Sequence, residues 1–281
     1  MKIEQIETTV LEMPYKKPLV TATNNFTVAR GLLVKVVTDG GIEGYGYSDL
    51  FPRTGETPET ARHVIESVLR AKVVGKDLED LVRLRADIDH TLTGNPRAKA
   101  ALETAMYDAL ARSYHIPLFL MLGGRYRKEI KVIKMVSVDV PEAMAEEAKQ
   151  LVREGLSLKL KVSGKIDQDL PRVAAVRKAV GDGVFIKVDA NEAYDAKTAI
   201  RLAKGLADHG VEVFEQPVPR DQLDALWEVK KHSPVKIEAD QSVRTVTDAQ
   251  MVIKNRMVDS INTGIPKIGS IGEVRRIAEL C

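Results

Sequence analysis

Several features that would mark a particular class of protein are scarce in this sequence. The 281 residues include one cysteine, Cys281, which excludes an internal disulfide framework and fits a reducing compartment. Basic and acidic residues number 42 and 40, so the net charge of +2 gives no basic stripe for nucleic acid. No run approaches about 18 apolar residues, and the start MKIEQIETTVLEMP does not resemble a signal peptide. We therefore expect a cytoplasmic protein that binds neither nucleic acid nor membrane.

Histidine is scarce as well, and none of the 5 histidines shows the spacing of a metal-ligand set. We interpret them as surface residues or satisfied core residues: His63, His90, His115, His209 and His232. A metal site in this chain would have to use oxygen ligands.

Two styles of secondary structure follow each other along the chain. Residues 1 to 48 contain β-rich runs with a hairpin turn at Gly40-Gly41, and residues 57 to 115 have apolar positions at helical spacing. This order predicts an α+β unit. After residue 125, β-rich runs alternate with helical stretches about every 25 to 30 residues, the length of a strand plus a crossover helix. The six expected strands are VIKMVSV, LSLKLKV, FIKVDA, VEVFEQ, VKIEAD and DSINTG.

This alternation predicts an α/β fold with a parallel β/α barrel or open sheet. A closed barrel needs eight strands and about 250 residues. We therefore expect an incomplete barrel with six of the eight strands, and we expect this sequence to be a fragment of a longer chain.

Three carboxylates stand at almost even spacing in the second half of the chain. They are Asp189 in VDAN, Glu215 in FEQP and Asp240 in EADQS, separated by 26 and 25 residues, and each ends a short apolar run. Because the carboxyl ends of parallel strands meet at one edge, the three side chains are expected to lie together. A hard ion such as Mg²⁺ suits oxygen ligands of this kind. For any one of them, a helix N-cap is the structural alternative.

Two lysines precede the carboxylates by about one such interval. In LSLKLKV the side chains alternate, so Lys159 and Lys161 share one face of the strand and the leucines share the other. Such a pair often lies on the wet face of an antiparallel edge strand, but a parallel strand covered by helices has no wet face.

The combination of a metal and two amines suggests a reaction. A carboxylate substrate bound to Mg²⁺ would have an acidified α-carbon, because the ion stabilises the charge that develops on the carboxylate oxygens. Lys161 would take or return the proton, and the like charge of Lys159 together with the metal would lower the pKa of Lys161.

With these motifs the chain resembles the muconate-lactonizing subgroup of the enolase superfamily. The resemblance is carried by GNPRAKAALETAMYDAL, IPLFLMLGG, the LKLK pair, VDAN, FEQP and the AD-x-S run. It implies an N-terminal α+β capping domain at residues 1–125 and a modified TIM-type β/α barrel at residues 126–281. It also implies a Mg²⁺-dependent isomerase, with Mn²⁺ as a substitute metal, that acts on a small carboxylate, and family members are often homo-oligomers.

The resemblance also assigns roles to individual residues. Lys161 becomes the catalytic base with Lys159 as its neighbour, and Asp189, Glu215 and Asp240 become the ligands of Mg²⁺. Substrate contacts are expected from cap loops at residues 21–26 and 51–57 and from the end of the VDAN strand. The residues that we predict for these contacts are Asn24, Phe26, Thr54 and Asn191.

Two positions depart from the pattern of the family. Gln241 replaces the Glu that normally follows the third ligand, which removes one negative charge. Gly264 in Asn262-Thr263-Gly264 replaces the lysine that serves as the second base. Lys267 matches a different lysine of the subgroup and is a candidate catalytic residue, with a loop or helix-start lysine as the alternative.

The missing second base decides the order of the expected activities. Racemases and epimerases use two bases, whereas a cycloisomerase can use one lysine. We therefore expect a reaction like that of muconate cycloisomerase, in which a proton is moved through an enolate. The alternatives are a dipeptide epimerase or N-acylamino acid racemase, which PRTGET and EQPVPRDQLDALWEVKKHSP resemble, an o-succinylbenzoate synthase-like dehydratase, and a catalytically inactive homologue.

Overall fold

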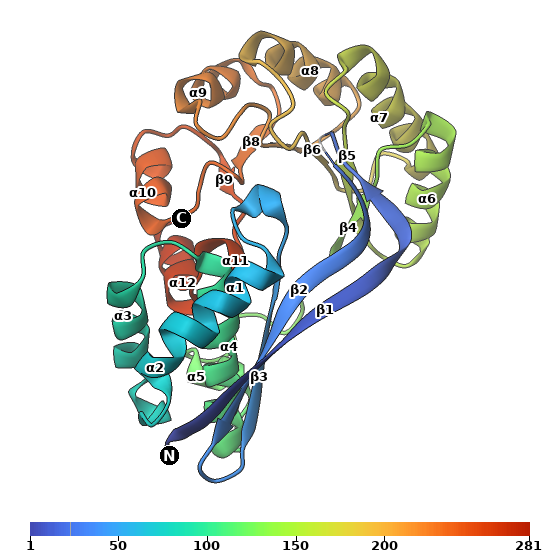
Figure 1. The fold of residues 1–281 in the computed structure, drawn as a ribbon. Coiled ribbons are helices and arrows are strands. Elements are labelled where there is room, and N and C mark those ends of the chain that lie inside the picture. Colours follow the sequence, from blue (N-terminus) through green and yellow to red (C-terminus); the bar gives the residue numbers. More distant parts are fainter. Residues whose placement is uncertain (23) are drawn as a thin grey trace. The chain divides into compact units, whose positions relative to one another are not determined.

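The computed structural model describes residues 1–22 and 24–281, and the chain divides into two compact units (Figure 1). One unit consists of Met1–Pro14, Val28–Lys128 and Gly264–Arg276. The other consists of Tyr15–Thr27, Glu129–Thr263 and Ile277–Cys281. The division into a capping domain at residues 1–125 and a barrel domain at residues 126–281 stays a prediction.

The first unit contains most of a three-stranded sheet in the order β1-β2-β3, followed by helices. Strands β2 and β3 are antiparallel, with Val36 opposite Gly44, so the hairpin predicted at Gly40-Gly41 is confirmed. The elements are β1 (Ile3–Val20), β2 (Asn25–Thr38), β3 (Glu43–Asp49), α1 (Pro58–Val64), α2 (Arg70–Val73), α3 (Leu81–Thr91), α4 (Pro96–Ser113) and α5 (Leu118–Met121). Between them lie 3₁₀ turns at Pro52–Thr54 and Leu78–Asp80 and a π-helical segment at Ile65–Leu69.

Helix α4 packs unusually closely on β3 because both surfaces carry small residues. A Cβ atom on Gly46 would lie 2.0 Å from the carbonyl oxygen of Ala101, and one on Gly44 would lie 2.2 Å from the amide nitrogen of Ala109. These distances are shorter than any van der Waals contact, so both positions require glycine. The alanine-rich helix predicted from AKAALETAMYDAL is confirmed, and its alanines form the face that contacts the strand.

A buried carboxylate on α4 attaches the segment Gly264–Arg276 to this unit. The segment contains α11 (Ile265–Ile268) and the start of α12 (Ile271–Leu280). Glu103, 3% exposed, accepts hydrogen bonds from Ser270 Oγ at 3.0 Å and from the backbone nitrogen of Ile271 at 2.8 Å. Glu103 thus binds the first amide of α12, a group with no partner inside its own helix.

The second unit is built on a parallel sheet of six strands in the order β4-β5-β6-β7-β8-β9. Helices connect successive strands, and α6 to α10 follow the outer side of the strand array in Figure 1. The elements are β4 (Ile133–Val136), α6 (Pro141–Arg153), β5 (Ser157–Lys161), α7 (Ile166–Val180), β6 (Ile186–Asp189), α8 (Ala196–Asp208), β7 (Val213–Glu215), α9 (Leu223–His232), β8 (Lys236–Ala239), α10 (Val246–Lys254) and β9 (Ser260–Ile261). The α/β fold with six of the eight strands of a barrel is therefore confirmed.

The strands bury one set of alternating side chains in the apolar core. Leu158 and Leu160 of β5, Ile186 and Val188 of β6, and Phe214 of β7 are fully buried. The intervening residues face the other way, and these include the lysines and carboxylates singled out in the sequence. The predicted alternation of LSLKLKV is confirmed.

The end of the β1–β2 hairpin groups with the second unit and lies beside β4. The backbone nitrogen of Val138 donates to the carbonyl oxygen of Val20 at 3.1 Å, and Ser137 Oγ donates to that of Pro18 at 3.4 Å.

Within the described residues, no helix combines the length and the apolar character that crossing a membrane requires.

Candidate functional site

Strand register places three charged residues in one row across the second unit. Lys161, the last residue of β5, is paired with Asp189 of β6, and Asp189 is paired with Glu215 of β7. All three residues end their strands and point to the same face of the sheet, as predicted from their positions after apolar runs.

The lysine ammonium groups contact the carboxylates directly. Lys161 Nζ lies 2.6 Å from Asp189 Oδ2 and donates to Asn191 Oδ1 at 2.8 Å. Lys159 Nζ lies 2.8 Å from both Asp189 Oδ2 and Glu215 Oε2. Five predicted site residues, Lys159, Lys161, Asp189, Asn191 and Glu215, therefore form one polar cluster. Asp189 does not cap the following helix, whose N-cap is Asp195.

The charges of this cluster do not balance evenly. Burial opposes ionisation of Asp189, but Lys161 and Lys159 outweigh it and lower its pKa to about 2. Burial also opposes the charge of Lys159, yet Asp189 and Glu215 raise the pKa of that lysine. For Glu215, burial and the negative charges of Asp189 and Asp240 raise the pKa despite Lys159 and Lys187. Around Glu215, burial and the neighbouring carboxylates thus outweigh the two ammonium groups.

The third predicted ligand, Asp240, follows β8 and is held by a side chain that the sequence analysis missed. Gln216 is fully buried, and its Oε1 accepts from the backbone nitrogens of Asp240 at 3.0 Å and Ser242 at 3.1 Å. Its Nε2 donates to the carbonyl oxygen of Val218 at 2.9 Å and to Ser242 Oγ at 2.8 Å. All four hydrogen-bonding positions of the amide are used. Gln216 directly follows the predicted ligand Glu215 in FEQP, and this position was the only indication in the sequence that its side chain supports the site.

The cluster offers carboxylate oxygens, which are the ligands that a hard cation prefers. No group of three His, Cys, Asp or Glu side chains in residues 1–22 and 24–281 has metal-binding geometry. Lys159 Nζ instead bridges Asp189 and Glu215. The oxygen donors of Asp189, Glu215 and Asp240 nevertheless fit a divalent cation, which would offset the repulsion of Glu215 by its two neighbouring carboxylates. Binding of Mg²⁺ by Asp189, Glu215 and Asp240 stays a prediction.

The sequence analysis also missed a second ion pair, which joins Lys187 of β6 to Glu238 of β8. These residues precede Asp189 and Asp240 by two positions. Lys187 Nζ lies 2.7 Å from Glu215 Oε2 and also contacts Glu238 Oε2. Glu238 Oε1 accepts from Ser260 Oγ of β9 at 3.0 Å. On β9 itself, Asn262 Nδ2 donates to Glu215 Oε1 at 2.8 Å.

The loop that follows Lys161 is fixed by a buried aspartate. Asp169 is fully buried and accepts five hydrogen bonds, the shortest from the hydroxyl of Tyr194 at 2.5 Å. The others come from Ser163, through its nitrogen and its hydroxyl, from the nitrogen of Lys165 and from Arg172. Asp169 thereby joins the loop after β5 to the loop after β6.

The predicted substrate-contacting residues lie in different parts of the chain. Asn191 joins the cluster, with a left-handed backbone of φ 47°. Asn24 and Phe26 belong to the β1–β2 hairpin in the second unit, and the backbone oxygen of Asn24 accepts from Thr21 N. Thr54 belongs to the first unit, where its hydroxyl donates to the carbonyl oxygen of Phe51 at 2.7 Å. Thr23 in the predicted loop at residues 21–26 lies outside the described residues.

The structure also describes the surroundings of Gln241, Gly264 and Lys267, the first two of which depart from the pattern that the resemblance implies. Gln241 Oε1 is buried and has no hydrogen-bond partner in the described part of the chain. Gly264 precedes α11 with an extended backbone, φ −163° and ψ 151°. Lys267 lies within α11, as in the helix-start alternative, and its catalytic role stays a prediction.

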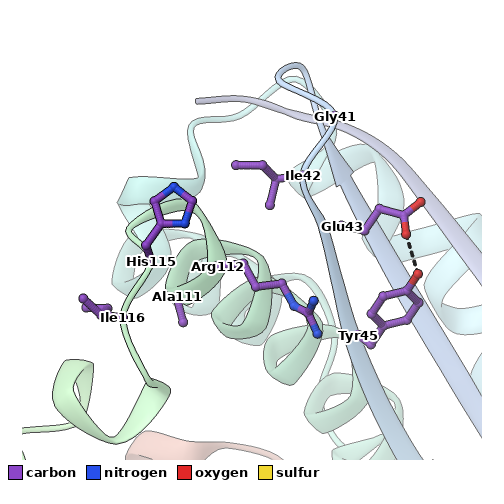
Figure 2. Close-up of a pocket in the computed structure, with 8 residues that line it drawn as sticks. All are labelled: Gly41, Ile42, Glu43, Tyr45, Ala111, Arg112, His115 and Ile116. Carbon is purple, nitrogen blue, oxygen red and sulfur yellow. Dashed lines mark hydrogen bonds between the residues drawn. The ribbon is translucent and has the colours of Figure 1, made fainter.

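A separate pocket in the first unit contains none of the predicted site residues (Figure 2). Its charged groups are already paired with one another or with neighbours. Tyr45 donates to Glu43, Lys35 lies 3.4 Å from Glu43, and Arg112 lies 2.8 Å from Asp108. The charged cluster of the second unit is therefore the better candidate site.

Comparison with known proteins finds matching family models and similar relatives. Residues 5–123 match the model of the mandelate racemase/muconate lactonizing enzyme N-terminal domain, and residues 143–281 match that of the enolase C-terminal domain-like family. The L-Ala-D/L-Glu epimerase of Bacillus subtilis is 37% identical over 290 residues, covering 100% of this chain and 79% of the relative. Muconate cycloisomerase 1 of Rhodococcus opacus is 33% identical over 288 residues, covering 100% of this chain and 77% of the relative.

A solved structure of a similar protein has the same fold as this chain. The dipeptide epimerase from Enterococcus faecalis, complexed with Mg and the dipeptide L-Leu-L-Tyr, has a TM-score of 0.95 and 32% identity. The match covers 100% of this chain and 79% of that one.

Proposed function

We propose a one-base reaction for this chain, which belongs to the muconate-lactonizing subgroup of the enolase superfamily and is an isomerase of that superfamily. In this reaction Lys161 takes or delivers the proton α to the carboxylate of a small substrate. Among one-base reactions, the activity that we propose first is one like that of muconate cycloisomerase.

The arrangement of amines carries the proposal. Three amines contact Asp189 and Glu215: Lys159 and Lys161 come from β5, and Lys187 comes from the neighbouring strand β6, so all three come from one side of the sheet order. The strand at the other end of the sheet order, β9, leads into Thr263 and Gly264 and contributes Asn262 rather than an amine. One amine-bearing side allows a proton to be taken from and returned to the same face of a substrate.

The carboxylates complete the proposed site. Asp189, Glu215 and Asp240 would hold a Mg²⁺ ion, which supplies Lewis-acid stabilisation of negative charge on the substrate carboxylate. Asn191 and Asp189 fix the position of the Lys161 ammonium through bonds of 2.8 and 2.6 Å. In the cycloisomerase direction, a carboxylate oxygen of the substrate forms a C–O bond at the double bond, and the adjacent carbon takes its proton from Lys161. In reverse, Lys161 takes that proton while the C–O bond breaks.

A dipeptide epimerase or racemase activity is the second candidate, and the comparisons favour it. The epimerase of Bacillus subtilis is 37% identical to this chain. Epimerisation requires a proton donor on the opposite face, which the lysine missing at position 264 would otherwise supply.

Proton exchange in D₂O distinguishes the two candidates. The protein is incubated with Mg²⁺ and with muconolactones, N-acylamino acids or dipeptides, and loss of the α-proton signal is followed by NMR. We expect exchange without racemisation, and Lys161→Ala should slow exchange by about 10²- to 10⁴-fold, the usual contribution of a general base. Lys149→Ala, which changes an exposed lysine of the same unit, should leave the rate unchanged.

Each other outcome contradicts a specific part of the proposal. Racemisation by the unmodified protein would show that a second proton donor exists despite Gly264. Exchange that survives in Lys161→Ala would show that the base is another residue. Absence of exchange with every substrate would favour the inactive homologue.

A further inference from the structure

The ion pair of Lys187 and Glu238 lies directly against the proposed metal ligands. Lys187 precedes Asp189 by two residues, and Glu238 precedes Asp240 by two residues. Each of the two side chains is 12% exposed. Lys187 Nζ lies 2.7 Å from Glu215 Oε2 while it also contacts Glu238 Oε2. The same ammonium is thus shared between a ligand and a carboxylate that is not a predicted ligand.

An ammonium that is bonded to a ligand oxygen competes with a cation for that oxygen. Its charge also repels the cation, and in a buried site this repulsion is only weakly screened. Glu238 opposes both effects, since it draws Lys187 toward its own carboxylate and neutralises its charge. Ser260 Oγ, which donates to Glu238 Oε1 at 3.0 Å, holds that carboxylate in place.

We propose that the Lys187–Glu238 pair sets the affinity of the carboxylate cluster for a divalent cation, with Glu238 restraining a lysine that would otherwise compete for Glu215. This inference rests on the proposed function, which requires the cluster to bind Mg²⁺. Glu238 and Lys187 act through Glu215 and are positioning residues.

The proposal predicts opposite effects for the two members of the pair. Glu238→Gln keeps an acceptor for Ser260 but leaves the lysine charge uncompensated, so binding of Mg²⁺ should weaken by about tenfold. Lys187→Met removes the competing ammonium, so binding should tighten by about tenfold. In the double variant both charges are absent, and the affinity should lie within about threefold of that of the unmodified protein.

Isothermal titration calorimetry with Mg²⁺ alone tests these values. Each single variant leaves a buried charge with fewer partners and is expected to lose stability. A loss of stability alone cannot move the two affinities in opposite directions, so the signs separate the proposed role from a merely structural one. Lys230→Met, which removes an equal charge from a pair with Asp259 elsewhere in the unit, is the matched control and should not change binding.

The results separate the failure of this inference from the failure of the proposed function. If the unmodified protein binds Mg²⁺ and the three pair variants and the control bind it equally, the Lys187–Glu238 pair has no such role while the metal site stands. If the unmodified protein binds no Mg²⁺, both the inference and the metal-dependent function are overturned.

Discussion

Replacement of Gln216 by glutamate should destabilise the second unit although the two side chains have the same shape. The amide of Gln216 donates to the carbonyl oxygen of Val218 and to Ser242 Oγ, and a carboxylate can donate neither bond. The oxygen that remains can still accept from the backbone nitrogens of Asp240 and Ser242. The change therefore removes half of the hydrogen bonds of a fully buried group and places a charge there.

The expected loss follows from these contacts. A buried polar group that is left without its partner costs about 1–3 kcal/mol, and the carbonyl oxygen of Val218 loses the amide donor of Gln216 while the new charge is desolvated. Together the two effects should lower the free energy of unfolding by about 3–5 kcal/mol at pH 7. Acidification should recover part of this loss, because burial raises the pKa of an introduced carboxyl and the protonated form can donate one bond.

Urea unfolding can be followed in the second unit alone. The only tryptophan of the chain, Trp227, lies in α9 of that unit, so its fluorescence reports on the unfolding of that unit. Gln241→Glu is the matched control, since it is the same chemical change beside the same ligand, at a side chain whose Oε1 has no hydrogen-bond partner in the described residues. We expect that control to cost less than about 1 kcal/mol. A loss below about 1 kcal/mol for Gln216→Glu would refute the proposed role of this amide in placing Asp240.

Two further predictions test the lysine missing at position 264 and the attachment of α12. Gly264→Lys should add racemisation to proton exchange, measured by NMR and chiral chromatography, whereas Gly264→Ala should not. Glu103 has a pKa raised by burial, so the folded state binds its proton more tightly than the unfolded state, and stability due to this group falls as the pH rises above about 4.3. The free energy of unfolding of the unmodified protein relative to Glu103→Gln should therefore decrease with pH, and a pH-independent difference in urea titrations would contradict the shift.

The fold was predictable from the sequence because its two patterns are local. Alternating β-rich runs and helical stretches gave all six strands of the parallel sheet, and helical periodicity gave α4. The close approach of α4 to β3 was not predictable, since it depends on which face of the helix meets Gly44 and Gly46. The attachment of α12 by Glu103 was missed for the same reason, because Ser270 is separated from Glu103 by 167 residues.

The candidate site was predictable to the extent that its residues end strands. Lys161, Asp189 and Glu215 stand at the last position of their strands, and parallel pairing then brings them side by side. Lys187 and Glu238 lie inside strands, where single charges in FIKVDA and VKIEAD gave no indication of a partner. Their contact depends on the register of strands that are not neighbours in the sheet, and local spacing does not encode that register.

The backbone at position 264 does not require the glycine that stands there. A φ of −163° is extended conformation that any residue adopts, and a Cβ atom there would meet only Pro266 Cδ, at 4.0 Å. This situation differs from that of Gly46, where a Cβ would collide with the backbone of α4. A lysine could therefore occupy position 264 without strain in the backbone. Folding therefore does not explain the glycine at position 264, and proton exchange on one face of the substrate, rather than stability, is the property that tests the proposed one-base reaction.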